Sequence, residues 1–244
     1  EDATRLNYMN DGFGVSASRG PVEVKLYKGN SDGEFYFTTL ELNNNGDVLP
    51  VLTCEDVSLT MSSFTKIQGV LNATNTDITT TYLRLSMGSE LNMDGGTLNL
   101  TQSTSDATFR IYSKMNLNNV VFSSVGSVIA STASGEPSSG NIIFSGSTSF
   151  TGTELIARSG CSISVLDNST VDVNSLDAAS FTVSSNSKIS VDSAADISID
   201  DLNVVLSESG ALDFSDIFSA DNGETIVFSA EQNISVYDGS GHLY

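Results

Sequence analysis

The chain has 244 residues, of which 10 are Lys or Arg and 30 are Asp or Glu, so its formal net charge is −20. Charged residues make up only 16% of the sequence, and Ser, Thr, Asn and Gly fill the difference from an average globular protein. Nucleic-acid binding needs a basic stripe, and a membrane-spanning helix needs about 18 consecutive apolar residues. We find neither and expect no nucleic-acid partner and no membrane insertion.

Short segments in which apolar and polar residues alternate run through the whole chain. They lie at 22–26, 35–37, 83–85, 91–93, 98–100, 109–111, 163–165, 171–173, 181–183, 189–191 and 197–199. This alternation is typical of strands with one buried face, whereas no segment keeps helical spacing of apolar residues over three turns. The sequence therefore predicts an all-β protein.

The spacing of these segments favours a solenoid. From Ile163 onward the strands begin every 8 to 10 residues, so three of them make a coil of about 24 to 26 residues, within the range of stacked repeats. We predict a right-handed parallel β-helix in which Ile163 stacks over Ile189 and Val171 over Ile197. The alternative is an antiparallel β-sandwich. The chain has only 3 Pro and few Asn-Gly or Asp-Gly hairpin signals in its middle, which favours the solenoid.

The two ends and one internal segment differ from the regular pattern. Residues 1–50 contain long Gly- and Asn-rich turns and predict an N-terminal cap or irregular first coils, because an open end of a solenoid exposes core and backbone. Residues 51–244 form the solenoid in this interpretation. Residues 131–140 predict a loop, and 225–228 with 234–237 predict a closing C-terminal hairpin.

One phrase recurs in the sequence: a small residue, then polar, apolar, polar and apolar residues, at 89–93, 161–165, 169–173 and 187–191. The phrase resembles the β-solenoid passengers of bacterial autotransporters and related surface proteins. The resemblance implies a secreted or cell-surface location in a Gram-negative bacterium. It also implies adhesion, presentation or extracellular hydrolysis, without choosing among them.

Catalytic chemistry in this chain would depend on carboxylates, because His242 is the single histidine and histidine-based triads or zinc sites need more. Aspartic peptidases carry two apolar residues followed by Asp-Thr/Ser-Gly. Asp94 and Asp238 follow a similar context, but Gly stands directly after each Asp. We keep both as candidate catalytic residues, with simple Asp-Gly turns as the alternative.

Two further groups of residues suggest chemistry. Asp192, Asp196, Asp200 and Asp201 could hold a Ca²⁺ ion between coils, or they could form a solvated acidic face; no other cofactor is expected. The two cysteines, Cys54 and Cys161, fit no CxxC metal site. They form either one long-range disulfide or two buried free thiols, and we favour the unpaired state because two cysteines rarely fall in register on a solenoid.

The sequence supports two functional hypotheses. The first is a secreted or cell-surface β-solenoid that acts as a binding or structural module and contacts extracellular polysaccharide or host glycoprotein. The alternative is an extracellular carboxylate-based hydrolase, either an aspartic-type peptidase or a glycosidase, acting on mucin-like substrates. Both are compatible with the acidic surface, which keeps the protein soluble.

Overall fold

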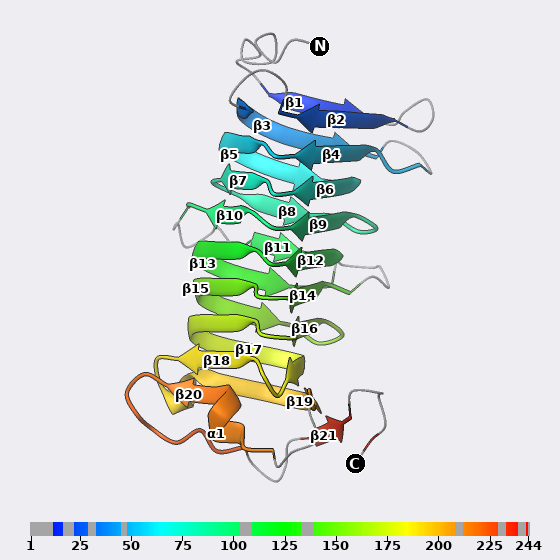
Figure 1. Ribbon diagram of the computed structural model, residues 1–244. Helices are drawn as coiled ribbons and strands as arrows, with labels where there is room; N and C mark the ends of the chain where they lie inside the picture. The colour runs from blue at the N-terminus through cyan, green and yellow to red at the C-terminus, as the bar shows by residue number, and fades with distance from the viewer. Residues whose placement is uncertain are drawn as a thin grey trace.

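The computed structural model describes residues 12–16, 22–28, 33–44, 48–102, 109–132, 139–207, 212–228, 233–238 and 243. The chain descends as a right-handed parallel β-helix: strands on the near side run from right to left, and strands behind them run from left to right (Figure 1). Every pairing between named strands is parallel, so the sandwich alternative is wrong. None of the helices in these residues has the length and hydropathy needed to cross a membrane.

Twenty-one strands in the described residues stack into three faces, which we call A, B and C. Face A contains β2 (Glu23–Tyr27), β4 (Val51–Glu55), β6 (Val70–Thr74), β9 (Glu90–Asp94), β12 (Lys114–Asn118), β14 (Asn141–Ser145), β16 (Ser162–Val165) and β21 (Asn233–Tyr237). Face B contains β7 (Asp77–Thr80), β10 (Thr97–Leu100), β18 (Lys188–Val191) and β20 (Phe218–Ala220). Face C contains β1 (Phe13–Ser16), β8 (Leu83–Leu85) and β11 (Phe109–Ile111).

The longer strands bend around a corner and contribute residues to two or three faces. β3 (Glu34–Asn43), β5 (Ser58–Ile67), β13 (Val121–Ala130) and β15 (Ser149–Ala157) begin on face B and end on face C. β17 (Thr170–Ser184) runs through faces B, C and A, and β19 (Ile197–Val205) runs from C to A. One turn of the solenoid therefore crosses A, then B, then C.

The core fills the space between the three faces. Alternate residues of each strand point inward, and the inward residues of successive coils stack in continuous rows. On face A one such row consists of Leu52, Leu71, Leu91, Met115, Ile142, Ile163, Phe181 and Leu202, all buried. Aromatic rings stack within the core as well, as in the Phe122–Phe150 pair with ring centres 4.5 Å apart. Burial of these apolar rows is the main force that holds the coils together.

Residues whose backbone is in the left-handed conformation, with positive φ, form the corner between faces A and B. Asp56, Asn75, Asn119 and Asp167 have φ between 45° and 60°, and Gly146 takes φ 65° at the same corner. Asn, Asp and Gly adopt this conformation more readily than other residues, which explains the polar signals between the predicted strands. Side chains also bridge coils here, since Asn75 Nδ2 donates to Asp56 Oδ1 at 3.2 Å.

The predicted solenoid is confirmed, but the predicted stacking register is wrong. Ile163 pairs with Phe181, Val171 with Ile189, and Leu176 with Ile197. The third strand of this coil is the middle of β17 around Leu176 and Ala178, which pack on face C. Its inward positions combine one large residue with one alanine, so the alternation was too weak to be recognised, and the coil is eighteen residues long at Ile163.

The described residues at the N-terminal end agree with the alternative of first coils, whereas the C-terminal end differs from the sequence interpretation. Within 1–50, β1, β2 and β3 pair in parallel with the coils below, so the described part of this segment belongs to the solenoid. The predicted closing hairpin is wrong: residues 225–228 form no strand, and β21 pairs in parallel with β19. Of the predicted loop at 131–140, residues 133–138 lie outside the described residues.

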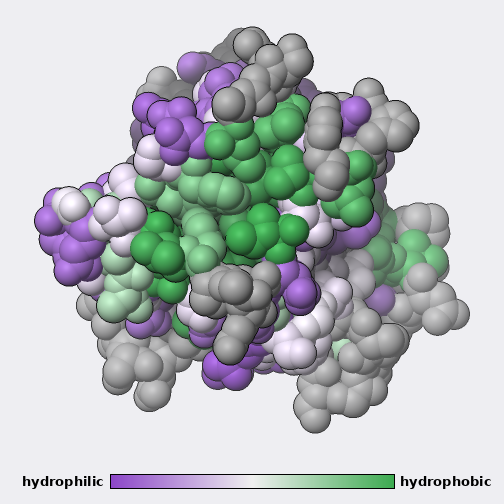
Figure 2. All heavy atoms as spheres, turned by 90° about the horizontal axis from the view of Figure 1, so that it is seen from below, coloured by the Kyte–Doolittle hydropathy of each residue, from purple (hydrophilic) through white to green (hydrophobic). Residues whose placement is uncertain are grey.

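An aromatic cluster closes the C-terminal end. The short helix α1 (Phe214–Ile217) brings Phe214 beside Phe218 and Phe228, with ring centres 5.0 to 6.5 Å apart. A 3₁₀ turn, η2 (Ala194–Asp196), precedes β19. Figure 2 views this end and shows apolar side chains gathered at its centre. The cluster therefore covers the last coils of the core in place of the expected hairpin.

Candidate functional site

The two candidate catalytic carboxylates lie far apart. Asp94 ends β9 and is exposed, and its Oδ1 accepts a hydrogen bond from Asn118 Nδ2 at 2.8 Å. Asp238 directly follows β21. Six strand spacings separate β9 from β21 on face A, or roughly 29 Å at about 4.8 Å per strand. The structure does not bring Asp94 and Asp238 together as a dyad.

The four candidate calcium ligands are spread over the last coils. Asp192 follows β18, Asp196 lies in η2, and Asp200 and Asp201 lie in β19; all four are exposed. Asp201 Oδ1 accepts a hydrogen bond from Asn233 Nδ2 at 2.7 Å. Within the described ranges, no three or more His, Cys, Asp or Glu side chains form a group that could hold a metal ion. His242 lies outside those ranges.

Both cysteines are buried free thiols, as the sequence interpretation favoured. Cys54 lies in β4 and Cys161 directly precedes β16. Five strand spacings separate these strands on face A, or roughly 24 Å, whereas disulfide-linked Cα atoms lie within about 7 Å of each other. Burial raises the pKa of Cys54 to about 12 and also raises the pKa of Cys161, so neither thiol is a nucleophile at neutral pH.

A different set of residues meets on face C. The outward-pointing middle row of this face runs, coil by coil, through Glu41, Lys66, Arg84, Arg110, Ile129, Ile156, Asp177 and Ser198. Three successive coils thus carry a basic side chain. We call Lys66, Arg84 and Arg110 the basic row.

Local sequence fixes the direction of each member of the basic row. Arg84 lies between buried Leu83 and Leu85, and Arg110 lies between buried Phe109 and Ile111. Because side chains of a strand alternate between its two faces, the burial of these neighbours forces both guanidinium groups outward. Lys66 follows the same rule between two buried residues of β5. The pairing of β5 with β8 and of β8 with β11 then places the three cations side by side.

Tyr112 holds the two arginines of the row. The guanidinium carbon of Arg84 lies 5.3 Å from the centre of the Tyr112 ring, a cation–π contact. Arg110 Nη1 donates a hydrogen bond to Tyr112 Oη at 3.2 Å, and this bond raises the pKa of Arg110 above its usual value. Tyr112 itself is buried. One fixed aromatic side chain therefore orients two neighbouring guanidinium groups.

Lys66 and Arg84 of the basic row form no salt bridge with a carboxylate of the described residues. In the described parts of the chain, ion pairs join Lys25 to Glu23 and Lys114 to Glu90, each at 3.6 Å, and Lys66 and Arg84 belong to neither. Two unit charges at the strand spacing repel each other by roughly 0.9 kcal/mol in water. The row therefore places three basic side chains side by side on one face of an acidic protein.

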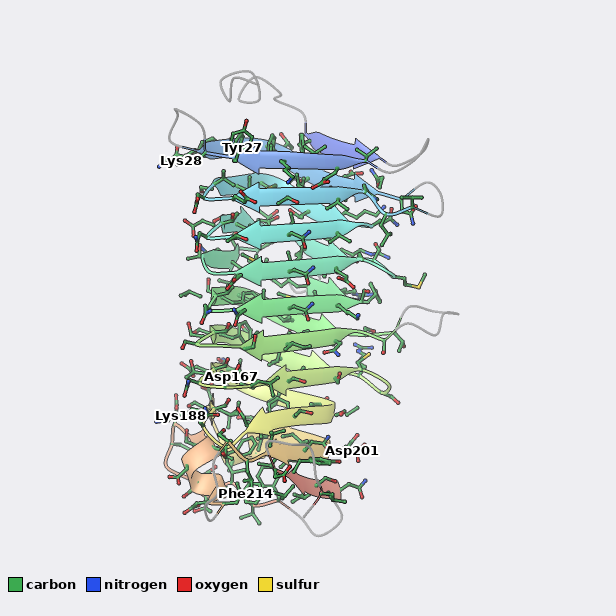
Figure 3. All side chains as sticks on the ribbon, turned by 45° about the vertical axis from the view of Figure 1, so that its right-hand side comes forward. Tyr27, Lys28, Asp167, Lys188, Asp201 and Phe214 are labelled. Carbon is green, nitrogen blue, oxygen red and sulfur yellow. The ribbon has the colours of Figure 1, made fainter. Side chains whose placement is uncertain are left out.

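Face A differs from face C, because the polar side chains of its outward row form hydrogen bonds with one another. Asn92 Nδ2 donates to Asn72 Oδ1 at 3.0 Å, and Asn116 Nδ2 donates to Asn92 Oδ1 at 2.7 Å. Figure 3 looks onto this face, with Tyr27 at one end of its top strand and Asp201 near the opposite edge below. Such amide ladders use their hydrogen-bonding groups to join coils. The middle of face A is a structural surface.

Sequence reasoning found the strands of the basic row but not the row itself. Residues 83–85 and 109–111 were predicted as strands, yet Lys66, Arg84 and Arg110 are eighteen and twenty-six residues apart. Only the strand pairing reveals that these unequal intervals bring them together. The sequence signal that could have revealed the row is a basic residue between two apolar residues, which occurs in both 83–85 and 109–111.

Comparisons with known proteins give no further guidance, since no family model, no curated protein and no solved structure matches the chain. The basic row, in which Tyr112 orients both arginines, is the best candidate for a binding site on the described surface. The geometry suits recognition of an anionic group, because guanidinium groups donate paired hydrogen bonds to carboxylate, sulfate or phosphate oxygens.

Proposed function

We propose that this protein is a secreted or cell-surface binding module whose β-solenoid displays a recognition surface for extracellular polysaccharide or host glycoprotein. The observation that carries the proposal is the basic row on face C, with Arg84 and Arg110 both held by Tyr112. The resemblance of its repeated phrase to autotransporter passengers of Gram-negative bacteria supports the location.

The scaffold suits such a role. Parallel strands fix the position of each outward side chain along the axis, and the buried rows beneath them prevent local rearrangement. A surface that is ordered before binding loses little conformational entropy when the ligand arrives. The solenoid thus acts as a rigid frame on which a few side chains give specificity.

The proposal is tested by retention and turnover measured on the same preparation. Purified protein is passed over immobilised mucin and over immobilised casein, and the released material is analysed for cleavage products from pH 3 to pH 9. We expect retention on mucin, weak or no retention on casein, and intact substrate. A protein that is not retained on mucin contradicts the binding role. Cleavage that disappears in Asp94→Asn or Asp238→Asn would instead support the carboxylate-based hydrolase.

A further inference from the structure

An asparagine followed by a glycine lies in the exposed turn after β20. Asn222 and Gly223 are both exposed, and they form the single Asn-Gly pair of the described ranges. Gly223 has φ 77°, and a Cβ atom placed on it would meet no atom beyond its chain neighbours within 4 Å. Because glycine carries no side chain, nothing shields the Gly223 nitrogen from the side chain of Asn222. The pair therefore has the open surroundings that a reaction between these two groups requires.

The backbone of the next residue polarises the Asn222 side chain. The Glu224 N–H donates a hydrogen bond to Asn222 Oδ1 at 3.0 Å. A donor at this oxygen stabilises the negative charge that develops on it when a nucleophile attacks Cγ. The Gly223 N–H donates to the Ala220 carbonyl oxygen at 3.0 Å, so this turn bond has to open before the nitrogen reacts. Hydrogen bonds of exposed turns open at a low cost in free energy.

The corners of the solenoid protect their asparagines from the same reaction. Four asparagines are exposed at the corner between faces A and B, namely Asn75, Asn119, Asn168 and Asn186. The residues that follow them are fully buried, namely Thr76, Val120, Ser169 and Ser187. Attack on these asparagines would have to come from a buried main-chain nitrogen, so the coil would first have to open locally. The turn after β20 gives Asn222 no such protection.

We propose that Asn222 is a self-modification site, at which the side-chain amide is converted to aspartate and isoaspartate. The Gly223 nitrogen loses its proton and forms a bond to Cγ of Asn222, the Cγ–Nδ2 bond breaks, and Nδ2 leaves with that proton as ammonia. One water molecule then opens the resulting five-membered imide. Opening at one carbonyl gives aspartate, and opening at the other gives isoaspartate, in which the main chain runs through the side-chain carbons. Water is the co-reactant, and nothing is oxidised or reduced.

The modification changes the contacts that hold the loop at 221–228. The side chain of Asn222 is hydrogen-bonded to the Glu224 carboxyl, and Glu224 Oε2 accepts a hydrogen bond from Ser193 Oγ at 3.0 Å. Conversion replaces the amide with a carboxylate, so two like charges repel each other where an amide–carboxylate hydrogen bond existed. The same loop ends at Phe228, a member of the aromatic cluster. The modified chain therefore holds this loop, and with it the aromatic cluster, less firmly.

Mass spectrometry of the full chain tests the site. The folded protein is incubated at pH 8 and 37 °C and digested with pepsin in acid, and fragment spectra locate each exchange of NH₂ for OH. We expect Asn222 to convert at least about tenfold faster than Asn75, Asn119, Asn168 or Asn186, because those positions require local opening of a coil. Asn222→Gln keeps an amide but cannot close a five-membered ring, so residue 222 should stay unmodified in this variant.

Thermal unfolding tests the consequence for the loop. Asn222→Asp carries the charge of the product, and Asn222→Gln is the matched variant that keeps a neutral amide. We expect Asn222→Asp to melt about 1 to 4 °C below Asn222→Gln at pH 7. The melting temperature of the incubated wild type should fall as residue 222 is converted, whereas that of incubated Asn222→Gln should stay constant.

Two results would overturn the proposal. Conversion of Asn222 that is no faster than conversion of the four corner asparagines contradicts the site. Equal melting temperatures of Asn222→Asp and Asn222→Gln, with no fall in the incubated wild type, contradict the loosening of the loop. Retention on mucin is measured separately, so neither result decides the proposed function.

Discussion

At the residue scale, alternation decides which way each side chain points. Ile163, Val171, Phe181 and Ile189 were predicted to be inward and are buried. Ile197 is only half-buried, because it begins β19 directly after the exposed turn η2. The small residue that opens the repeated phrase also has a physical reason: Ser89, Cys161, Ser169 and Ser187 are all buried at corners, where a large side chain would not fit.

Ile189 and Ser190 provide a direct test of this alternation. Ile189 is 1% exposed, so Ile189→Ala should lower the free energy of unfolding by about 2 to 5 kcal/mol through lost burial and a cavity. Ser190 points outward and donates a hydrogen bond to Asp221 Oδ1 at 2.7 Å. Ser190→Ala should therefore cost no more than about 1 kcal/mol. Urea unfolding of both variants measures the difference, and equal losses would contradict the register of β18.

The two thiols test the burial of Cys54 and Cys161. Since burial raises the pKa of both, to about 12 for Cys54, we expect neither to react appreciably with a thiol reagent at pH 8 while the protein is folded. Denaturation without a reductant should release two reactive thiols, because the cysteines are unpaired. Mass spectrometry after alkylation counts them. An unmodified, disulfide-linked denatured chain would contradict the placement of the two strands.

At the element scale, the strands could be predicted but their grouping into coils could not. The apolar–polar–apolar triplets identified strands on all three faces, among them β9 on face A, β10 on face B and β8 on face C. The face C part of β17 was missed because its inward residues are Leu176 and Ala178, and the omission shifted the stacking of Ile163 from Phe181 to Ile189. Coil lengths also vary. The basic row could not be predicted for the same reason, since its recognition requires the register.

The loop after β20 is an element whose stability should depend on pH. Hydrogen bonds from Asn222, Ser193 and Ala194 lower the pKa of the Glu224 carboxyl; Ser193 Oγ and the Ala194 amide donate to Glu224 Oε2 at 3.0 and 3.1 Å. A lowered folded-state pKa means that the carboxylate stabilises the fold above its unfolded pKa. That contribution is lost as pH falls through the folded pKa.

Glu224→Gln measures this contribution. The wild type should melt at a higher temperature than Glu224→Gln at pH 7, and the difference should shrink as the pH falls from the unfolded pKa of a glutamate, about 4.3, through the lowered folded pKa. Glu55→Gln, at the exposed end of β4, is the matched control for the loss of one exposed carboxylate. A Glu224 effect that is the same at pH 7 and pH 3 would refute the assignment.

At the scale of the whole molecule, the three faces share one core and differ in surface chemistry. Face A carries the amide ladder of Asn72, Asn92 and Asn116, which joins coils. Face C carries the basic row. The aromatic cluster covers the C-terminal end, where apolar side chains gather (Figure 2). Because each coil contacts only its neighbours, the solenoid can change the outward residues of one face without altering the core. Binding is therefore expected to be confined to one face.

The central claim, that face C recognises the ligand, is tested most directly by NMR of the protein labelled at isoleucine methyl groups. Ile156 lies on the outward row of face C, two strands from Arg110, and Ile143 lies on the outward row of face A below Asn116. Titration with mucin fragments should shift the methyl signal of Ile156 and leave that of Ile143 unchanged. A shift at Ile143 with none at Ile156 would contradict the account.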